Sequence, residues 1–206
     1  MRLIWVLKVH TWYNTGMTIT SAVFVKSING TDKILYDAKF QVAFVGRSNV
    51  GKSSVINSLV HEKLARSSKA PGKTKHLDIF VINNKFYFVD FPGYGFAHAS
   101  ADERERYRKM MMWYFEYSEV KRRVVIHIVD SVVGMTDFDL QMVDYLAKLK
   151  IDRIIIANKI DKLSKLEQKK QIDEITKQSG GAIVIPYSTK TNEGRSSILL
   201  TLEHMI

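Results

Sequence analysis

The chain has 206 residues, and its 31 Lys and Arg outnumber its 21 Asp and Glu, which gives a formal net charge of +10 at pH 7. It contains no Cys, so a disulfide framework, a thiol nucleophile and a Cys-liganded zinc site are excluded. The length and the 46% hydrophobic, 25% charged composition suit one globular domain, and no apolar run approaches the roughly 20 residues of a membrane helix.

Residues 1–16 differ in character from the rest of the chain. Their apolar piece, residues 3–7, is cut off by Lys8, is too short for the core of a signal peptide, and is followed by no small-residue cleavage site. A more ordinary stretch begins at Met17. We therefore expect residues 1–16 to be a disordered or non-native extension and residues 17–206 to form the domain.

Apolar runs and helical spacings alternate along that domain. Strands are expected at residues 40–45, 77–82, 85–90, 123–130, 153–157 and 182–186. Helices are expected at residues 52–64, 101–119, 136–149, 163–178 and 194–205, with Ser100 and Thr136 as caps. Asn83 and Asn84 predict a hairpin turn. The pattern indicates a doubly wound α/β fold with about six strands, mostly parallel, helices on both faces and one antiparallel edge hairpin.

The strongest motif follows the first of these strands. Residues 46–53, GRSNVGKS, match G-x-x-x-x-G-K-[ST] between a strand and a helix. Its glycines let successive N–H groups point at phosphate oxygens, and the helix N-terminus adds positive potential. Lys52 would supply charge to the β- and γ-phosphates, and the Ser53 hydroxyl would ligate Mg²⁺. A chance glycine-rich turn is the alternative. The phosphate-binding residues predicted here are Gly46, Arg47, Ser48, Asn49, Val50, Gly51, Lys52 and Ser53.

A second motif, Asp90-Phe91-Pro92-Gly93, ends another predicted strand. The Asp90 carboxylate can hold Mg²⁺ through water, and the Gly93 N–H can meet a γ-phosphate. Between the two motifs lies a polar loop that contains Pro71-Gly72-Lys73-Thr74. Thr74 is placed to complete the Mg²⁺ shell while a γ-phosphate is present, and an ordinary loop threonine is the alternative.

Two further motifs follow the last strands. In Asn158-Lys159-Ile160-Asp161, an ionised Asp161 can accept two hydrogen bonds from the N1–H and 2-amino group of guanine, a donor pair that adenine lacks. An exposed polar turn is the alternative. The backbone of Ser188 and Thr189 can meet the guanine O6. All four motifs follow strands in order, which favours a guanine-nucleotide site at the carboxyl ends of the strands.

The segments GRSNVGKSS, PGKTK, VDFPGYGFA and NKID resemble the EngB (YihA-type) GTPases of the translation-factor-related class, and the similarity covers about residues 20–204. The resemblance implies a small-GTPase-like P-loop fold, Mg²⁺-dependent GTP binding and hydrolysis, a role in assembly of the large (50S) ribosomal subunit, and a link to cell division and septation. It also implies a cytoplasmic monomer that binds GTP, GDP and the large subunit or its precursors, with no membrane partner.

The resemblance also assigns residues. Nucleotide contacts are implied for residues 46–53, and for Gly72, Lys73, Thr74, Lys75, His76, Asp90, Phe91, Pro92, Gly93, Asn158, Lys159, Ile160, Asp161, Tyr187, Ser188 and Thr189. Ser53 and Thr74 would ligate Mg²⁺, together with Asp90 from the second motif. One departure stands out: the family usually has an Arg where this chain has Val132.

Hydrolysis is expected to be slow, because Tyr94 stands where many GTPases place a water-orienting Gln. Catalytic roles are expected for Lys52, Thr74, Gly93 and Asn49. In related GTPases with a similar loop, an Asn at the position of Asn49 helps to ligate K⁺, so we hypothesise K⁺-stimulated hydrolysis. Arg47 and Arg104 are candidate charge donors to the reaction, with solvated surface arginines as the alternative. His127 is expected to be a hydrogen-bonded core residue.

The basic excess favours an anionic partner, nucleic acid first, with a basic surface kept for solubility as the alternative. We expect two switch segments that change with the nucleotide: the loop that contains Thr74 and the segment that follows Gly93. Cations gather around both, at Lys63, Arg66, Lys69, Lys73, Lys75, Arg104, Arg106, Arg108 and Lys109. Nucleotide state can therefore present or withdraw them from an RNA surface. Two other functions stay open: a phosphotransferase for small molecules, which the NKID motif argues against, and a non-ribosomal division scaffold with GTP as a structural ligand.

Overall fold

The computed structural model describes residues 16–65, 76–95 and 100–206. Residues 1–15 of the predicted extension lie outside this range. So do four predicted nucleotide-binding residues, Gly72, Lys73, Thr74 and Lys75.

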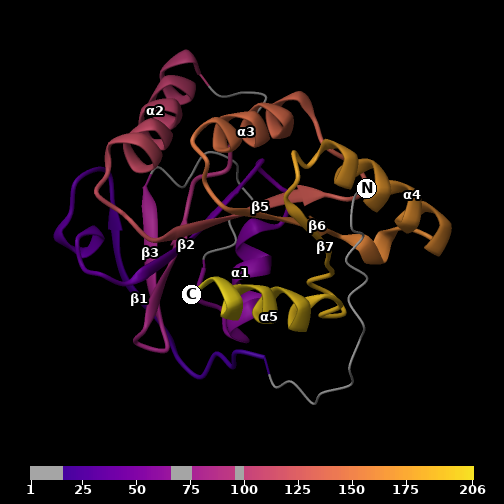
Figure 1. The fold of residues 1–206 in the computed structure, drawn as a ribbon, viewed down its shortest axis with the longest axis horizontal. Helices are drawn as coiled ribbons and strands as arrows, with labels where there is room; N and C mark the ends of the chain where they lie inside the picture. The colour runs from indigo at the N-terminus through magenta and orange to yellow at the C-terminus, as the bar shows by residue number, and fades with distance from the viewer. Residues whose placement is uncertain (1–15, 66–75, 96–99) are drawn as a thin grey trace, which may run out of the picture.

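A seven-stranded mixed sheet forms the centre of the fold (Figure 1). Its strands, in spatial order, are β1 (Ala22–Ile28), β3 (Leu77–Ile82), β4 (Phe86–Asp90), β2 (Phe40–Gly46), β5 (Arg123–Asp130), β6 (Arg153–Asn158) and β7 (Ile183–Pro186). β3 pairs antiparallel with β1 and β4, and the pairs from β4 to β7 are parallel. The predicted α/β fold with an antiparallel edge is therefore confirmed.

The edge strand β1 was not predicted, although it begins with four apolar residues, AVFV. In the structure Val23, Phe24 and Val25 are exposed, so this apolar run does not mark a buried strand. Its backbone pairing with β3, irregular between Phe24 and Lys26, holds it in the sheet. The neighbouring hairpin is as predicted: Asn83 and Asn84 have φ values of 50° and 53°, as a tight primed turn requires.

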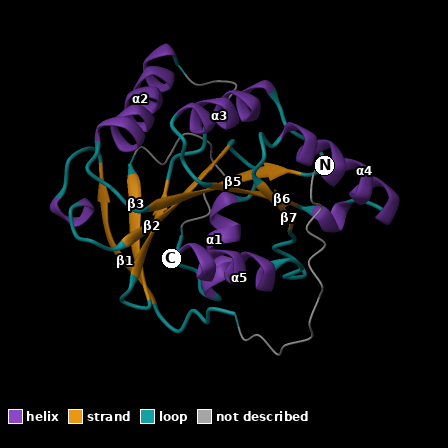
Figure 2. Cartoon of the chain, viewed as in Figure 1, coloured by secondary structure: helices purple, strands orange, loops and turns teal. Residues whose placement is uncertain are grey.

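Helices cover both faces of the sheet (Figure 2). On one face lie α1 (Lys52–Val60) and α5 (Arg195–Met205), whose Ile56, Leu59 and Leu202 pack in one core cluster with Phe44 and other strand residues. On the other lie α2 (Ala101–Met112), α3 (Asp137–Lys148) and α4 (Lys165–Gln178). Two further core clusters form there, one with α2 and α3 and one with α3 and α4.

Three predicted helices have different ends from those expected. The helix expected at 52–64 ends at Val60, because His61 takes a left-handed φ of 57°. The helix expected at 101–119 is α-helical only to Met112, and Trp113–Tyr117 form a π-helical turn, η2. The helix expected at 163–178 begins at Lys165, where Ser164 and Glu167 form a reciprocal capping box.

The parallel strands bring the four motifs to one edge of the sheet. β2, β4 and β6 end in Gly46, Asp90 and Asn158, and Tyr187 directly follows β7. The carboxyl ends of neighbouring parallel strands meet at the same edge, which is where ligands of such sheets bind. Within the described ranges, no helix is long and apolar enough to span a bilayer.

Candidate functional site

The loop of residues 46–53 connects β2 to α1, and its glycine at position 51 is required by the backbone. Gly51 caps α1 with a left-handed φ of 96°. A Cβ at this position would also lie only 2.5 Å from Nδ2 of Asn158. Lys52 and Ser53 are the first two residues of α1. Their place at the helix start puts a cation and a hydroxyl beside the free N–H groups of the first turn.

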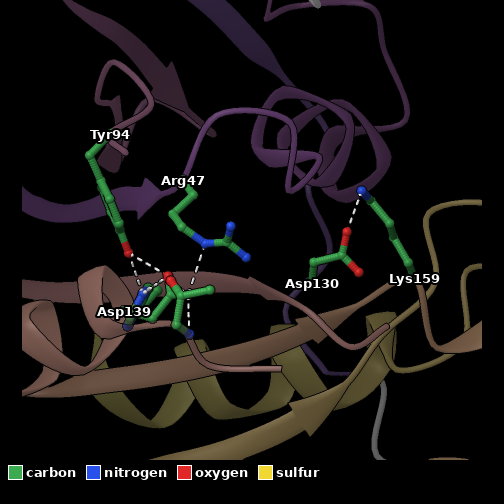
Figure 3. Close-up of polar contacts among 7 residues, drawn as sticks. Arg47, Tyr94, Asp130, Asp139 and Lys159 are labelled. Carbon is green, nitrogen blue, oxygen red and sulfur yellow. Dashed lines mark hydrogen bonds and ion pairs between the residues drawn. The ribbon is translucent and has the colours of Figure 1, made fainter. Parts of the chain in front are cut away.

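Side chains from the end of β6 brace this loop. Asn158 Nδ2 donates to the Val50 carbonyl at 2.8 Å, and Lys159 Nζ donates to the Asn49 carbonyl at 2.7 Å. The same ammonium lies 2.6 Å from Oδ2 of Asp130, the last residue of β5 (Figure 3). Residues of the predicted base-binding motif therefore also fix the loop that is predicted to bind phosphate.

The second motif is joined to the loop through its backbone. Ser48 N donates to the Tyr94 carbonyl at 2.9 Å, and Tyr94 N donates to the Gly46 carbonyl at 3.2 Å. Gly93 lies so close to the loop that an added Cβ would be 2.9 Å from Ser48 Oγ. Phe91 and Pro92 are buried, so only their backbone can face a ligand.

Lys52 and Asp90 form an ion pair at the centre of the site. Burial raises the pKa of Asp90, and the charge of Lys52 opposes that shift. The Asp90 carboxylate and the Ser53 hydroxyl are oxygen donors of the kind that Mg²⁺ prefers, so these residues fit that ion. Within the described part of the chain, no three His, Asp or Glu side chains form a metal-binding group. A bound Mg²⁺ would thus take further ligands from phosphate or water.

The base-selecting residues lie on the turn after β6 and the loop after β7. Asp161 is exposed in the short 3₁₀ turn η3 (Ile160–Lys162), and its Oδ1 accepts a hydrogen bond from Ser188 Oγ at 2.6 Å. Ile160 and Tyr187 are buried, and the Tyr187 hydroxyl lies 2.7 Å from Ser58 Oγ in α1. These two can offer a base only their backbone, whereas Asp161 can offer a carboxylate.

A buried polar cluster behind the loop contains residues with a different role from the one expected. The Tyr94 hydroxyl lies 2.6 Å from His127 Nε2 and 2.9 Å from Asp139 Oδ1, and Arg47 Nε lies 2.9 Å from Asp139 Oδ2 (Figure 3). Arg47 is therefore neither a solvated surface arginine nor free to donate charge to a reaction in this conformation. The expectation of a hydrogen-bonded core histidine at position 127 is confirmed. Arg104 is exposed on α2.

Of the predicted contacts at residues 72–76, the structure describes only His76. Thr74 and its neighbours from 72 to 75 lie outside the described residues. His76, at the start of β3, is exposed and contacts the Asn29 side chain. Asp130 and Asp139 were missed by the sequence analysis, although Asp130 ends a buried strand just as Asp90 does, and Asp139 stands three residues after the cap Thr136.

Comparisons with known proteins show similarity to one family of GTP-binding proteins. Residues 41–159 match the family described as 50S ribosome-binding GTPase. The "Probable GTP-binding protein EngB" of Thermotoga maritima is 41% identical over 164 residues, which cover 78% of this chain and 84% of that protein. The protein of the same name from Petrotoga mobilis is 35% identical over 193 residues, covering 92% of this chain and 98% of the relative.

Solved structures show the same fold. The crystal structure of a probable GTP-binding protein engB superposes with a TM-score of 0.68 at 24% identity, covering 80% of this chain and 97% of that one. Aquifex aeolicus Era bound to GDP and AlF4⁻ gives a TM-score of 0.66 at 25% identity, covering 81% of this chain and 56% of that one.

The bond between Asn158 and the loop can be tested by Asn158→Ala. The change leaves the Val50 carbonyl without its donor, so we expect GDP and GTP affinities to fall together by about tenfold, since a lost buried hydrogen bond costs roughly 1–2 kcal/mol. Titration calorimetry with each nucleotide measures this.

Asn57→Ala is the matched control: Asn57 Nδ2 donates to the Ala65 carbonyl at 2.8 Å, away from the predicted contacts. It should lower the free energy of unfolding but leave both affinities unchanged. Unchanged affinity in Asn158→Ala would show that the loop does not need this brace.

Proposed function

The chain belongs to the EngB-type GTP-binding proteins, a family of GTP hydrolases, and from that premise we propose that it grips the large ribosomal subunit, or its precursors, in a nucleotide-dependent manner. The observation that carries the nucleotide-dependent part of this proposal is the convergence of the phosphate loop and Asp161 at one edge of the sheet, where Asn158 and Lys159 connect them. Phosphate binding and guanine selection are then properties of one connected structure.

Guanine selection rests on Asp161. A carboxylate accepts hydrogen bonds and donates none when ionised, so it matches the N1–H and 2-amino donors of guanine. Ser188 Oγ donates to Asp161 and accepts from the backbone N–H groups of Lys190 and Thr191 at 3.1 and 3.2 Å, which holds the carboxylate in one orientation. Asn158, Lys159 and the backbone of Ile160, Tyr187, Ser188 and Thr189 complete the proposed base site.

Asp161→Asn tests base selection. The amide replaces an acceptor with a donor on one side, so GDP affinity should fall by about ten- to a hundredfold, as for a lost charge-assisted hydrogen-bond pair, and xanthosine diphosphate should be preferred. Competition binding against a fluorescent nucleotide measures both. Asp173→Asn, a change at an exposed carboxylate of α4, is the control and should leave GDP affinity unaltered. A variant at 161 that still prefers GDP would sink the proposed role.

The triphosphate site is proposed along residues 46–53, with the backbone of Asp90–Gly93 facing the γ-phosphate. Lys52 would exchange its Asp90 partner for phosphate oxygens, and Ser53, Thr74 and Asp90 would hold Mg²⁺ directly or through water. When bound, Mg²⁺ neutralises charge on the β- and γ-phosphates. Residues 72–76, with Thr74 as the switch threonine, would complete the contacts on the γ-phosphate side.

Slow hydrolysis is supported by the hydrogen bonds that already occupy the Tyr94 hydroxyl. Its hydroxyl is bound to Asp139 and His127, and its side chain is only 7% exposed, so it does not orient water as a Gln in this position would. Lys52, Gly93 and Thr74 are left to stabilise the transferring phosphoryl group. We propose that a K⁺ ion near Asn49 adds positive charge, because Asn49 is an exposed residue of the phosphate loop and is accessible to ions in solution.

The K⁺ proposal predicts a GTPase rate several-fold higher in KCl than in NaCl at equal ionic strength, measured as phosphate release. Asn49 has a left-handed φ of 68°, so Asn49→Gly removes the side chain without adding backbone strain. In that variant the two salts should give the same rate. Equal rates in the unaltered protein would refute a K⁺ role.

A ribosomal partner is supported by charge and by family. The matched family is described as 50S ribosome-binding, and the chain carries a net charge of +10. On α2, Arg108 and Lys109 pair with Glu105. A groove of about 840 Å³ beside the turn after β1 is lined by the cations Arg106 and Lys109 and by the carboxylates Asp102 and Glu105. We place ribosomal RNA contacts on α2, next to the second switch segment, through phosphate and shape rather than base reading. A role in ribosome assembly would link the protein to cell division and septation. We propose that it acts in the cytoplasm as a monomer, with residues 17–206 as its G domain.

Nucleotide-dependent pelleting tests the partner. We expect the protein to sediment with large subunits in GMPPNP and much less in GDP. The double change Arg104→Ala and Arg106→Ala should reduce pelleting several-fold, whereas Lys169→Ala with Lys170→Ala on α4 should not. No pelleting with the large subunit or its precursors in either state would favour a division scaffold outside the ribosome.

A further inference from the structure

One carboxylate, Asp139, is shared by three separate parts of the chain. It belongs to the first turn of α3 and is fully buried. Its Oδ2 accepts from Arg47 Nε of the phosphate loop at 2.9 Å and from the N–H and hydroxyl of Thr136 at 2.9 and 2.8 Å. Its Oδ1 accepts from the Tyr94 hydroxyl at 2.9 Å (Figure 3). Asp139 therefore holds the phosphate loop and the segment after Gly93 against α3.

The proton positions in this cluster follow from the chemistry of its members. Burial, followed by the charge of Asp139, raises the pKa of Tyr94 well above its usual value, so its hydroxyl stays protonated and donates to the carboxylate. A phenol has one proton, so its oxygen must accept from His127 Nε2 at 2.6 Å. Burial favours neutral Asp139, but His127 and the Thr136 N–H outweigh it and hold the pKa of Asp139 at about 2.

The cluster fixes the position of one backbone group in particular. Tyr94 bonds through its backbone to Gly46 and Ser48, and its side chain is tied to Asp139. Gly93 stands directly between these attachments and the Asp90 end of β4, pressed against Ser48. Because Gly93 is covalently joined to Tyr94, a displacement of Tyr94 would also move the Gly93 N–H.

We infer that Asp139 and Tyr94 are positioning residues for the γ-phosphate: through them α3 sets where the Gly93 N–H stands relative to the phosphate loop. The inference rests on the proposed GTP site, in which Gly93 meets the γ-phosphate and does not contact GDP. Arg47 supports the same arrangement, because its ion pair with Asp139 connects the start of the phosphate loop to the carboxylate that binds Tyr94. Tyr94 thus takes the place of a water-orienting Gln with a different task, the placement of a backbone donor.

The test compares two ligands in the same variant. Tyr94→Phe keeps the ring and removes only the hydroxyl, so GMPPNP affinity should fall by about tenfold, as for a hydrogen bond to a charged group, while GDP affinity stays within about twofold. Asp139→Asn should shift the same ratio in the same direction. Titration calorimetry with Mg²⁺ and each nucleotide gives both constants, and circular dichroism melting reports stability separately.

Tyr87→Phe is the matched control, because the Tyr87 hydroxyl also donates to a carboxylate, Asp37 Oδ2 at 2.6 Å, near the opposite end of the strands. Tyr87 is 6% exposed and Tyr94 7%. The control should lower stability without changing the ratio of the two affinities. If Tyr94→Phe weakens GDP and GMPPNP equally, or weakens neither, the positioning role is wrong. If the unaltered protein binds neither nucleotide, the proposed function fails instead.

Discussion

The loop between β2 and α1 keeps its shape through hydrogen bonds that it receives from other strands, and every proposed contact depends on that constraint. Val50 and Asn49 offer their carbonyls to Asn158 and Lys159, and Ser48 is bonded to the backbone of Tyr94. Because the loop is held at Ser48, Asn49 and Val50, its N–H groups keep one arrangement before a ligand binds, which lowers the entropy cost of binding.

Among the described residues, three cations at or beside the phosphate loop have carboxylate partners. Lys52 pairs with Asp90, Lys159 with Asp130, and Arg47 with Asp139. The Lys159–Asp130 and Arg47–Asp139 pairs stabilise the loop, because Lys159 also donates to the Asn49 carbonyl and Arg47 connects the loop to α3. Lys52 alone lies at the start of α1, where a phosphate group can replace its partner. These three pairs carry no net charge, so the net charge of +10 is contributed by other side chains of the chain.

The parts of the fold and of the candidate site that could be predicted from the sequence are those that short, local patterns specify. The buried strands β2, β5 and β6 are continuous apolar runs, and Lys52 and Asp161 stand in short motifs whose chemistry needs no distant residue. The exposed edge strand β1 begins with four apolar residues, but Lys26 and Ser27 interrupt the run before Ile28. The spacing from the cap Thr136 marks Asp139 only as a capping residue. Its contacts with Tyr94 and Arg47 could not be predicted, because these residues are 45 and 92 positions away. The π-helical turn after Met112 likewise depends on tertiary packing rather than on helix propensity.

The central claim is that one connected edge of the sheet binds polyphosphate and selects guanine. Titration calorimetry of the unaltered, Mg²⁺-replete protein with GDP and with ADP tests it most directly, because the two ligands share their phosphates and sugar and differ only in the base. The account predicts tight binding of GDP and an affinity for ADP lower by several orders of magnitude, because adenine lacks the two donors that the Asp161 carboxylate would accept from. Equal affinity for the two nucleotides, or binding of neither, would contradict it.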